Sequence, residues 1–318
     1  MKENLRKMTA LHKMENCQAS MKDELLCSAK YEKSEKDILI VVHNQLDYIK
    51  KCIESIKENT ENYNIFIWDN ASDQETREYL ESISARPPAN RKMLGKDGSI
   101  MVLRSEENIG FIEPNNRLFE LGLSDYVILL NSDTEVKPDW DKAMIGWLQQ
   151  NEDVGQTGYM GGILNDEFRG GKINFGSNID YICGWAMCVR RDLLDGWLDR
   201  LNSPAPNKKR FFPSKFDEEP FFKLFDQKNL KFAYAEDADL SLRIKEHGFD
   251  IYALHLDLVV HHENKTIKAV NQSPDEGGLK IDLKKTFHEN HEYLKKRWSN
   301  FEALQSGLTH LEEPTKTR

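Results

Sequence analysis

The sequence predicts an α/β fold with a mostly parallel central sheet and helices on both of its faces. Two observations carry this prediction. From residue 37 to residue 130, short β-branched runs alternate with amphipathic stretches, and the connections between them are short. The first run, DILIVVH at 37–43, is almost continuously apolar, which is typical of a strand that is buried on both faces.

The first half of the chain alternates regularly. After the strand at 37–43, apolar residues at helical spacing (Leu46, Ile49 and Ile53) predict a helix. The same two patterns then repeat up to residue 130. The predicted strands are 37–43, 64–69, 99–104 and 126–130, and the predicted helices are 46–56, 73–84 and 115–122.

The second half is less regular. A helix is expected at 140–148, followed by a glycine-rich stretch at 155–176 that predicts loops. The apolar run at 181–190 predicts another strand. Further elements are expected as helices at 221–230, 237–247 and 281–298, and as short strands at 251–254 and 258–261.

The 318 residues divide into one domain with two extensions. Residues 1–36 are polar and charged and form an N-terminal extension. Residues 37–265 form the domain, and residues 266–318 form a C-terminal helical tail. The sequence leaves open whether copies of the chain associate into a homo-oligomer.

Composition narrows the classes of partner. The net charge of −9 argues against a protein that coats nucleic acid or an anionic membrane. No window reaches the roughly 18 apolar residues of a transmembrane segment, and the N-terminus lacks a signal-peptide core. The five cysteines form no CxxC pair, which predicts reduced thiols in a cytoplasmic protein. Peripheral attachment to the inner membrane face stays open.

Polar residues end three of the predicted strands. His43, Asp69 and the segment from Asn131 to Asp133 should share one rim, because ligands bind at the carboxyl ends of parallel strands. Asp133 suits a hard divalent cation such as Mg²⁺ or Mn²⁺, or it caps a turn. Asp69 could accept a hydrogen bond from a nucleobase or ribose, or it forms an Asx-turn.

Three carboxylates open the predicted helix at 237–247. Glu236, Asp237 and Asp239 suit the positive end of the helix dipole, so capping alone could explain them. Crowding of these acids should also raise at least one pKa, as a general base requires. The pair His261 and His262 ends an apolar strand and supplies either a metal ligand or structural contacts.

Several common catalytic motifs are absent from the sequence. No GxGxxG follows a strand, no GxxxxGK[ST] occurs, and no GxSxG elbow occurs. Dinucleotide binding, P-loop chemistry and serine hydrolysis therefore have no support.

Seven segments together resemble family-2 glycosyltransferases of the GT-A (Rossmann-like) fold, and they occur in the order that this family shows. They are IVVHNQLDY (40–48), WDNAS (68–72), ENIGF (107–111), LLNSDTEV (129–136), CGWAMCVRR (183–191), AEDADLSLR (235–243) and VVHH (259–262).

The resemblance implies a nucleoside-diphosphate sugar donor, with a UDP-, dTDP- or GDP-sugar as candidates. Asp69 would recognise the base, and His43 would lie near the base or ribose. Asn108 and Asn116 would border the nucleotide. His43 stands at a position where many members of that family carry tyrosine.

The resemblance also implies a metal site and a sugar site. Asp133 would be the main ligand of Mn²⁺ or Mg²⁺ at the diphosphate, with Asn131 beside it and His261 as a further contact. Asn131 keeps an acceptor oxygen but lacks a charge, which would weaken metal affinity. Gly184 and Trp185 would lie near the transferred sugar and the acceptor.

Asp237, flanked by Glu236 and Asp239, would deprotonate the acceptor hydroxyl in a single inverting displacement. The implied enzyme is a hexosyl- or deoxyhexosyltransferase of glycan or polysaccharide assembly, and its acceptor is a glycan, a lipid-linked substrate or a protein. An insertion at 87–98 matches no motif. A basic stretch at 207–215 could contact an anionic acceptor or form a solvated loop.

Two alternatives stay open. A sugar nucleotidyltransferase would need a glycine-rich basic loop after the first strand, where this chain has NQLDY at 44–48. A catalytically inactive nucleotide-sugar-binding module would not need Asp133 and Asp237.

Overall fold

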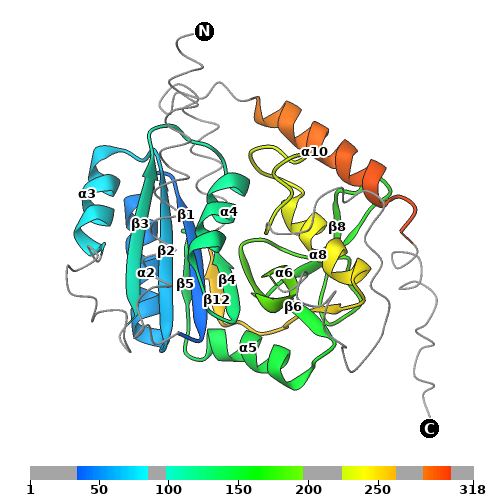
Figure 1. Cartoon of the computed structure of the whole chain (residues 1–318), viewed down its shortest axis with the longest axis horizontal. Helices are drawn as coiled ribbons and strands as arrows, with labels where there is room; N and C mark the ends of the chain where they lie inside the picture. Colours follow the sequence, from blue (N-terminus) through cyan, green and yellow to red (C-terminus); the bar gives the residue numbers. More distant parts are fainter. Residues whose placement is uncertain (1–33, 85–97, 196–223, 263–281, 302–318) are drawn as a thin grey trace.

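The structure is a computed structural model of the whole chain, and it describes residues 34–84, 98–195, 224–262 and 282–301. Its centre is a seven-stranded sheet with the strand order β11-β6-β10-β4-β1-β2-β3 (Figure 1). These strands are β1 (Lys36–Val42), β2 (Tyr63–Asn70), β3 (Ser99–Ser105), β4 (Tyr126–Leu130), β6 (Val154–Gly158), β10 (Ala186–Arg190) and β11 (Asp250–Ala253).

The sheet is mostly parallel, as the sequence predicts. β3, β2, β1 and β4 are parallel neighbours, and β11 is parallel to β6. β10 is antiparallel to both β4 and β6, so it alone runs against the rest. The carboxyl ends of β1, β2 and β4 therefore meet at one rim.

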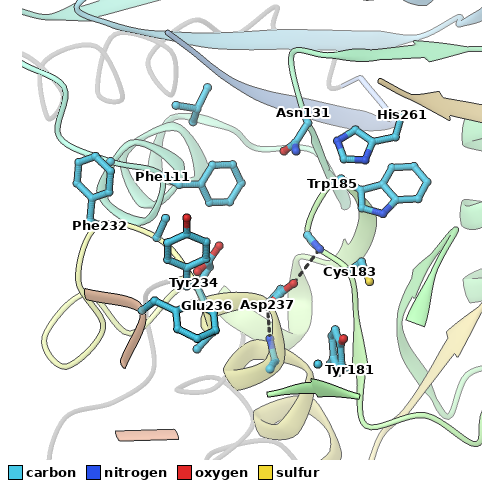
Figure 2. Close-up of a pocket in the computed structure, with 18 of the residues that line it drawn as sticks. Phe111, Asn131, Tyr181, Cys183, Trp185, Phe232, Tyr234, Glu236, Asp237 and His261 are labelled. Atoms are coloured by element: carbon cyan, nitrogen blue, oxygen red, sulfur yellow. Dashed lines mark hydrogen bonds between the residues drawn. The ribbon is translucent and has the colours of Figure 1, made fainter. Parts of the chain in front are cut away.

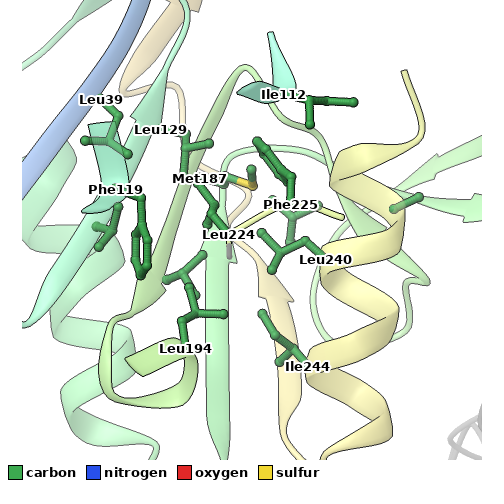
Figure 3. Close-up of a cluster of buried hydrophobic side chains, with 14 of the residues drawn as sticks. Leu39, Ile112, Phe119, Leu129, Met187, Leu194, Leu224, Phe225, Leu240 and Ile244 are labelled. Atoms are coloured by element: carbon green, nitrogen blue, oxygen red, sulfur yellow. The ribbon is translucent and has the colours of Figure 1, made fainter. Parts of the chain in front are cut away.

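Helices cover both faces of the sheet. They are α2 (Leu46–Asn59), α3 (Gln74–Ile83), α4 (Ile112–Leu121), α5 (Trp140–Gln150), α6 (Asp192–Asp195), α8 (Glu236–Glu246) and α10 (Leu283–Trp298). Residues of α2, α3 and α5 join one buried cluster, and residues of α4, α8 and α10 join the other. Figure 3 shows the second cluster, to which α8 contributes Leu240 and Ile244 and the sheet contributes Leu129 and Met187.

Alternation along each strand explains the two cores. Leu39 of β1 and Leu129 of β4 belong to the cluster under α8, whereas Ile38 and Ile40 belong to the cluster under α2. Successive side chains of a strand point to opposite faces. A strand buried on both sides therefore needs apolar residues at nearly every position, which is the pattern at 37–43.

The predicted loops at 155–176 are wrong, because this region forms β6, β7 (Gly161–Leu164) and β8 (Gly170–Asn174). Glycine marks close packing here rather than a turn. A Cβ on Gly158 would lie 2.3 Å from Cγ2 of Ile182 and 2.8 Å from the carbonyl oxygen of Ala186.

Two further predicted elements are corrected. The strand at 181–190 breaks into β9 (Tyr181–Ile182), which joins a sheet of order β8-β7-β9, and β10 of the central sheet. The predicted helix at 221–230 is a series of turns over its described part, 224–230. A long-range contact holds these turns, since the amide of Asn116 bonds the backbone N–H and C=O of Phe225 at 2.7 and 3.0 Å.

A small two-stranded sheet completes the rim. β5 (Thr134–Val136), which the sequence did not predict, pairs antiparallel with β12 (Val259–His261). This pairing carries the segment after Asn131 to the histidines near residue 261.

The C-terminal helix α10 packs on the domain, with Leu294 and Trp298 buried in the cluster under α8. The limits of the N- and C-terminal extensions stay a prediction. The segments at 1–33, 87–97 and 207–215 lie outside the described residues. Within the described ranges, no helix has both the length and the apolar character that crossing a bilayer requires.

Candidate active site

A cavity of about 790 Å³ lies at the carboxyl ends of the parallel strands. His43 follows β1, Asn70 ends β2, and the segment from Asn131 to Asp133 follows β4, and all of these residues line it. The opposite wall comes from the start of α8 and from α10. The topology thus brings the predicted rim residues of these three strands to one place, with the exception of Asp69.

Asp133 and His261 form one end of the cavity. Antiparallel pairing of β5 and β12 places His261 opposite Thr134, and the backbone N–H of His262 donates to the carbonyl of Asp133 at 2.9 Å. As a result, Nε2 of His261 lies 3.3 Å from Oδ1 of Asp133. Trp185 stacks on the His261 ring at a centroid distance of 5.1 Å and orients it.

The donor set at this end suits a divalent cation. The Asp133 carboxylate is 2% exposed, and Nε2 of His261 is buried with no hydrogen-bond partner among the described residues. The Asn131 side chain lies beside His261 and Trp185 (Figure 2). No group of three His, Cys, Asp or Glu in the described ranges could hold a metal by itself. Ligand oxygens and water would have to complete the coordination, as they commonly do for Mg²⁺ at phosphates.

Asp237 lies between that end and the aromatic side chains of Phe111 and Tyr234 (Figure 2). Its Oδ2 accepts a hydrogen bond from the Gly184 N–H at 3.0 Å, and its Oδ1 accepts one from the Ala238 N–H at 2.8 Å. The break between β9 and β10 leaves this N–H of Gly184 available to Asp237. Burial raises the pKa of Asp237, while the two N–H donors lower it.

Glu236 precedes Asp237 and also lines the cavity. It is 8% exposed, and its Oε2 has no hydrogen-bond partner within the described part of the chain. Burial, followed by the negative charge of Asp237, raises the pKa of Glu236 to about 8. Near neutral pH a proton therefore resides on Glu236, and the two N–H donors favour the ionised form of Asp237.

This pKa predicts a pH-dependent stability. Because Glu236 ionises near 4.5 when unfolded and near 8 when folded, the folded state binds more protons between these values. The free energy of unfolding should fall as pH rises through this window, by up to about 1.4 kcal/mol per pH unit. Glu236→Gln removes this contribution, so its melting temperature relative to wild type should rise from pH 5 to pH 8.

The control is Glu75→Gln, which changes an exposed glutamate of α3. Its difference from wild type should be independent of pH. Melting curves of the three proteins at pH 5, 6, 7 and 8 measure both differences. A pH-independent difference for Glu236→Gln would show that Glu236 ionises normally in the folded protein.

At the ends of β1 and β2, hydrogen bonds fix the residues that line the cavity. Nδ1 of His43 lies 2.8 Å from the carbonyl oxygen of Asn70, and burial lowers the pKa of His43, which favours the neutral imidazole. Oδ1 of Asn108 accepts hydrogen bonds from Nδ2 of Asn70 at 2.7 Å and from the N–H of Gly110 at 3.0 Å. His43 and Asn108 both line the cavity.

Three predicted site residues do not line the cavity. Asp69 accepts a hydrogen bond from the Ser72 N–H at 2.9 Å, which is the Asx-turn alternative, and it also pairs with Arg104. Asn116 binds the backbone of Phe225. Their side chains are thus engaged in holding loops at the rim.

Asp239 is the third of these residues, and its placement gives no support to a catalytic role. It is fully buried on the face of α8 away from the cavity. Its oxygens accept hydrogen bonds from Nε of Arg243 at 2.8 Å and from Nε1 of Trp298 at 3.0 Å. The helical repeat separates it from Asp237, because residues two apart on a helix do not share a face.

The aromatic wall of the cavity was missed by the sequence reasoning. Its members come from three segments that are far apart in the sequence. The residues of α10 were not considered because the sequence places this helix in a C-terminal extension outside the domain. Phe111 lies in the matched segment ENIGF, which was a usable signal. The wall comprises Phe111, Phe232, Tyr234, Phe287 and His291.

Comparison with known proteins gives one family match. The profile described as "Glycosyl transferase family 2" matches residues 37–225. A curated protein of Haemophilus influenzae, described as "Uncharacterized glycosyltransferase", is 25% identical over 122 residues. That alignment covers 38% of this chain and 35% of the relative, so the chain matches about a third of the relative's length.

Two solved structures are similar at low identity. S. aureus TarS, residues 1–349, has 13% identity and a TM-score of 0.47, covering 87% of this chain and 75% of TarS. The mannosyltransferase PcManGT of Pyrobaculum calidifontis, in complex with GDP-Man and Mn²⁺, has 13% identity and a TM-score of 0.47. The match covers 95% of this chain and 84% of PcManGT.

Proposed function

The chain belongs to glycosyl transferase family 2, and we propose that it moves a sugar from a nucleoside-diphosphate sugar to an acceptor hydroxyl with inversion at the anomeric carbon. One observation carries the proposal. The Asp133–His261 pair and the Asp237 carboxylate face one cavity. Such a site offers a binding point for a diphosphate and, separately, a base for the acceptor.

The diphosphate of the donor would lie at the Asp133 end. Asp133 and His261, with Asn131 beside them, are the residues that would hold Mn²⁺ or Mg²⁺. A bound cation would supply positive charge that offsets the charge developing on the leaving diphosphate. Trp185 keeps the His261 ring oriented, and Gly184 and Trp185 would border the transferred sugar.

Asp237 would accept the proton of the acceptor hydroxyl. As the hydroxyl oxygen bonds to the anomeric carbon, the bond from that carbon to the diphosphate oxygen breaks, and a single displacement of this kind inverts the configuration. The raised pKa brings this carboxylate closer to the working pH, which suits a general base. Glu236 would hold the neighbouring proton and so keep Asp237 the ionised member of the pair.

The finer assignments belong to this proposal. The donor would be a UDP-, dTDP- or GDP-linked hexose or deoxyhexose, with His43 and Asn108 beside the nucleoside. The acceptor would be a glycan, a lipid-linked substrate or a protein in polysaccharide assembly. We place this chemistry in the cytoplasm, where its free cysteines (Cys52, Cys183 and Cys188) would stay reduced.

The test is a thermal-shift screen of UDP, dTDP, GDP and their sugars, with and without Mn²⁺. Ligand binding raises the melting temperature by mass action, by an amount equivalent to about 2.7 kcal/mol at a hundredfold excess over Kd. We expect one nucleotide to stabilise the protein only with Mn²⁺, and its sugar to be hydrolysed slowly to the nucleoside diphosphate.

Other outcomes separate the alternatives. Metal-dependent binding without hydrolysis or transfer would indicate an inactive binding module. Release of pyrophosphate from a nucleoside triphosphate and a sugar 1-phosphate would indicate a nucleotidyltransferase. Failure of every nucleotide to bind would contradict the proposal.

A further inference from the structure

The segment before α8 has an unusual backbone. Phe232, Tyr234 and Ala235 have φ values of 61°, 81° and 69°, in the left-handed region that residues other than glycine rarely adopt. Ala235 is the N-cap of α8 and offers no side-chain hydrogen bond to the helix. Such a backbone persists only where the surrounding structure holds it, and such strain tends to cluster at functional sites.

The side chain of Asn290 in α10 stabilises this backbone through hydrogen bonds. The amide nitrogen of Asn290 lies 2.8, 2.9 and 3.0 Å from the carbonyl oxygens of Lys231, Ala233 and Tyr234. Its Oδ1 accepts the Lys231 N–H at 3.0 Å. Asn290 is 1% exposed, so its amide engages four backbone groups away from water.

The held segment forms part of the cavity wall. Phe232 and Tyr234 line the cavity, and Glu236 and Asp237 follow directly in the chain (Figure 2). The carbonyl of Phe232 also accepts the N–H groups of Phe111 and Ile112 at 2.6 and 3.1 Å. The segment therefore joins the first turn of α4 to the first turn of α8.

Gly110 leaves room for this junction. A Cβ at Gly110 would lie 2.5 Å from the carbonyl oxygen of Phe232, and φ of Gly110 is +89°. On the other side, the Tyr234 ring meets Phe287 of α10 edge-on at a centroid distance of 5.3 Å. The segment is thus fixed from the α4 side and from the α10 side.

We propose that Asn290 is a positioning residue that holds residues 231–235 in this strained conformation and so places Glu236 and Asp237 against the acceptor. The inference rests on the proposed function for the role of the two carboxylates. The proposal gives α10 a role in the reaction, although this helix begins more than 40 residues after Glu236 and Asp237. Loss of the amide would let the segment relax and misplace the base, and a misplacement of about 1 Å can cost about 10²-fold in rate.

The experiment compares two variants of α10. Asn290→Asp keeps the size of the side chain but turns a carboxylate oxygen toward three carbonyl oxygens. Leu294→Ala, one turn later, removes a fully buried apolar side chain and leaves Asn290, with its hydrogen bonds to the segment, in place. Three quantities are measured well below each melting temperature: kcat for transfer or donor hydrolysis, nucleotide affinity with Mn²⁺, and hydrogen exchange of a peptide covering residues 231–237.

We expect Asn290→Asp to lower kcat by at least about tenfold, with nucleotide affinity within twofold of wild type and faster exchange at 231–237. Leu294→Ala should lower the melting temperature while keeping kcat within twofold. If Asn290→Asp does not fold, Asn290→Ser, whose hydroxyl can still donate one hydrogen bond, should show the same pattern with a smaller loss of kcat.

Equal losses of kcat in Asn290→Asp and Leu294→Ala would overturn the proposal, because packing of α10 alone would then explain both. An unchanged kcat, or an equal loss of kcat and nucleotide affinity, would also overturn it. A further outcome is that wild type has no activity with any donor while Asn290→Asp still shows faster hydrogen exchange at residues 231–237. That result would contradict the proposed function but support the claim that Asn290 holds residues 231–235.

Discussion

Replacing Asp237 by asparagine should lower sugar transfer by about 10²–10⁴-fold, the usual contribution of a general base. Asparagine has nearly the same size, but it cannot take the proton of the acceptor hydroxyl. One amide oxygen can still accept the Gly184 or Ala238 N–H, so the start of α8 should stay folded. The rate of transfer is measured at saturating donor and acceptor.

Donor binding should survive this substitution, because the nucleotide would lie at the Asp133 end of the cavity. Calorimetry with the nucleotide and Mn²⁺ should give an affinity within about threefold of wild type, less than 1 kcal/mol. Asp180→Asn is the control, since Asp180 is a part-buried carboxylate that accepts the Leu164 N–H at 2.8 Å and does not line the cavity. Normal transfer by Asp237→Asn would remove the base assignment.

Replacing Asp133 by alanine should abolish metal-dependent donor binding. The carboxylate is the only full negative charge beside the His261 nitrogen at that end of the described cavity wall. A metal at a leaving diphosphate is worth several kcal/mol, so the rate should fall by about 10³-fold. The melting temperature of the variant should no longer rise when nucleotide and Mn²⁺ are added together.

Glu135→Gln is the matched control for Asp133→Ala. Glu135 lies two residues away on β5, and its carboxylate bonds His262 at 2.7 Å on the outer side of the strand. This variant should keep the nucleotide- and Mn²⁺-dependent rise in melting temperature. An unchanged response of Asp133→Ala would contradict the assignment of Asp133 to the metal.

The local spacing of apolar residues was sufficient to predict the parallel half of the sheet. The run at 37–43 and the helix that follows it are predicted because burial on both faces demands apolar residues at almost every strand position, while a helix needs them only on one face. β1 and α2 appear where the pattern places them. The rim shared by His43 and Asp133 follows from parallel topology alone.

The prediction from local spacing was wrong where contacts with residues far away in the sequence determine the backbone conformation. Gly158 belongs to a strand because β6 pairs with β10 and β11, and its missing Cβ leaves room for Ile182 and Ala186. A glycine-rich stretch taken by itself indicates loops. The turns at 224–230 form against Asn116, which lies more than 100 residues earlier. No window of sequence contains both partners of such a contact.

The sequence by itself determined the α/β class, the order of the main elements, and the residues that meet at the strand ends, because these depend on periodicity and strand direction. Only the tertiary structure decided which acids face the cavity. Asp237 points into it, whereas Asp239 is buried against Arg243 and Trp298. Only the tertiary structure also shows the role of α10. The sequence places this helix in a C-terminal extension, yet it brings Asn290 to the backbone that precedes Glu236 and Asp237. The reason is physical: the side of a helix that a residue occupies follows from its spacing, but what lies opposite that side is set by elements far away in the chain.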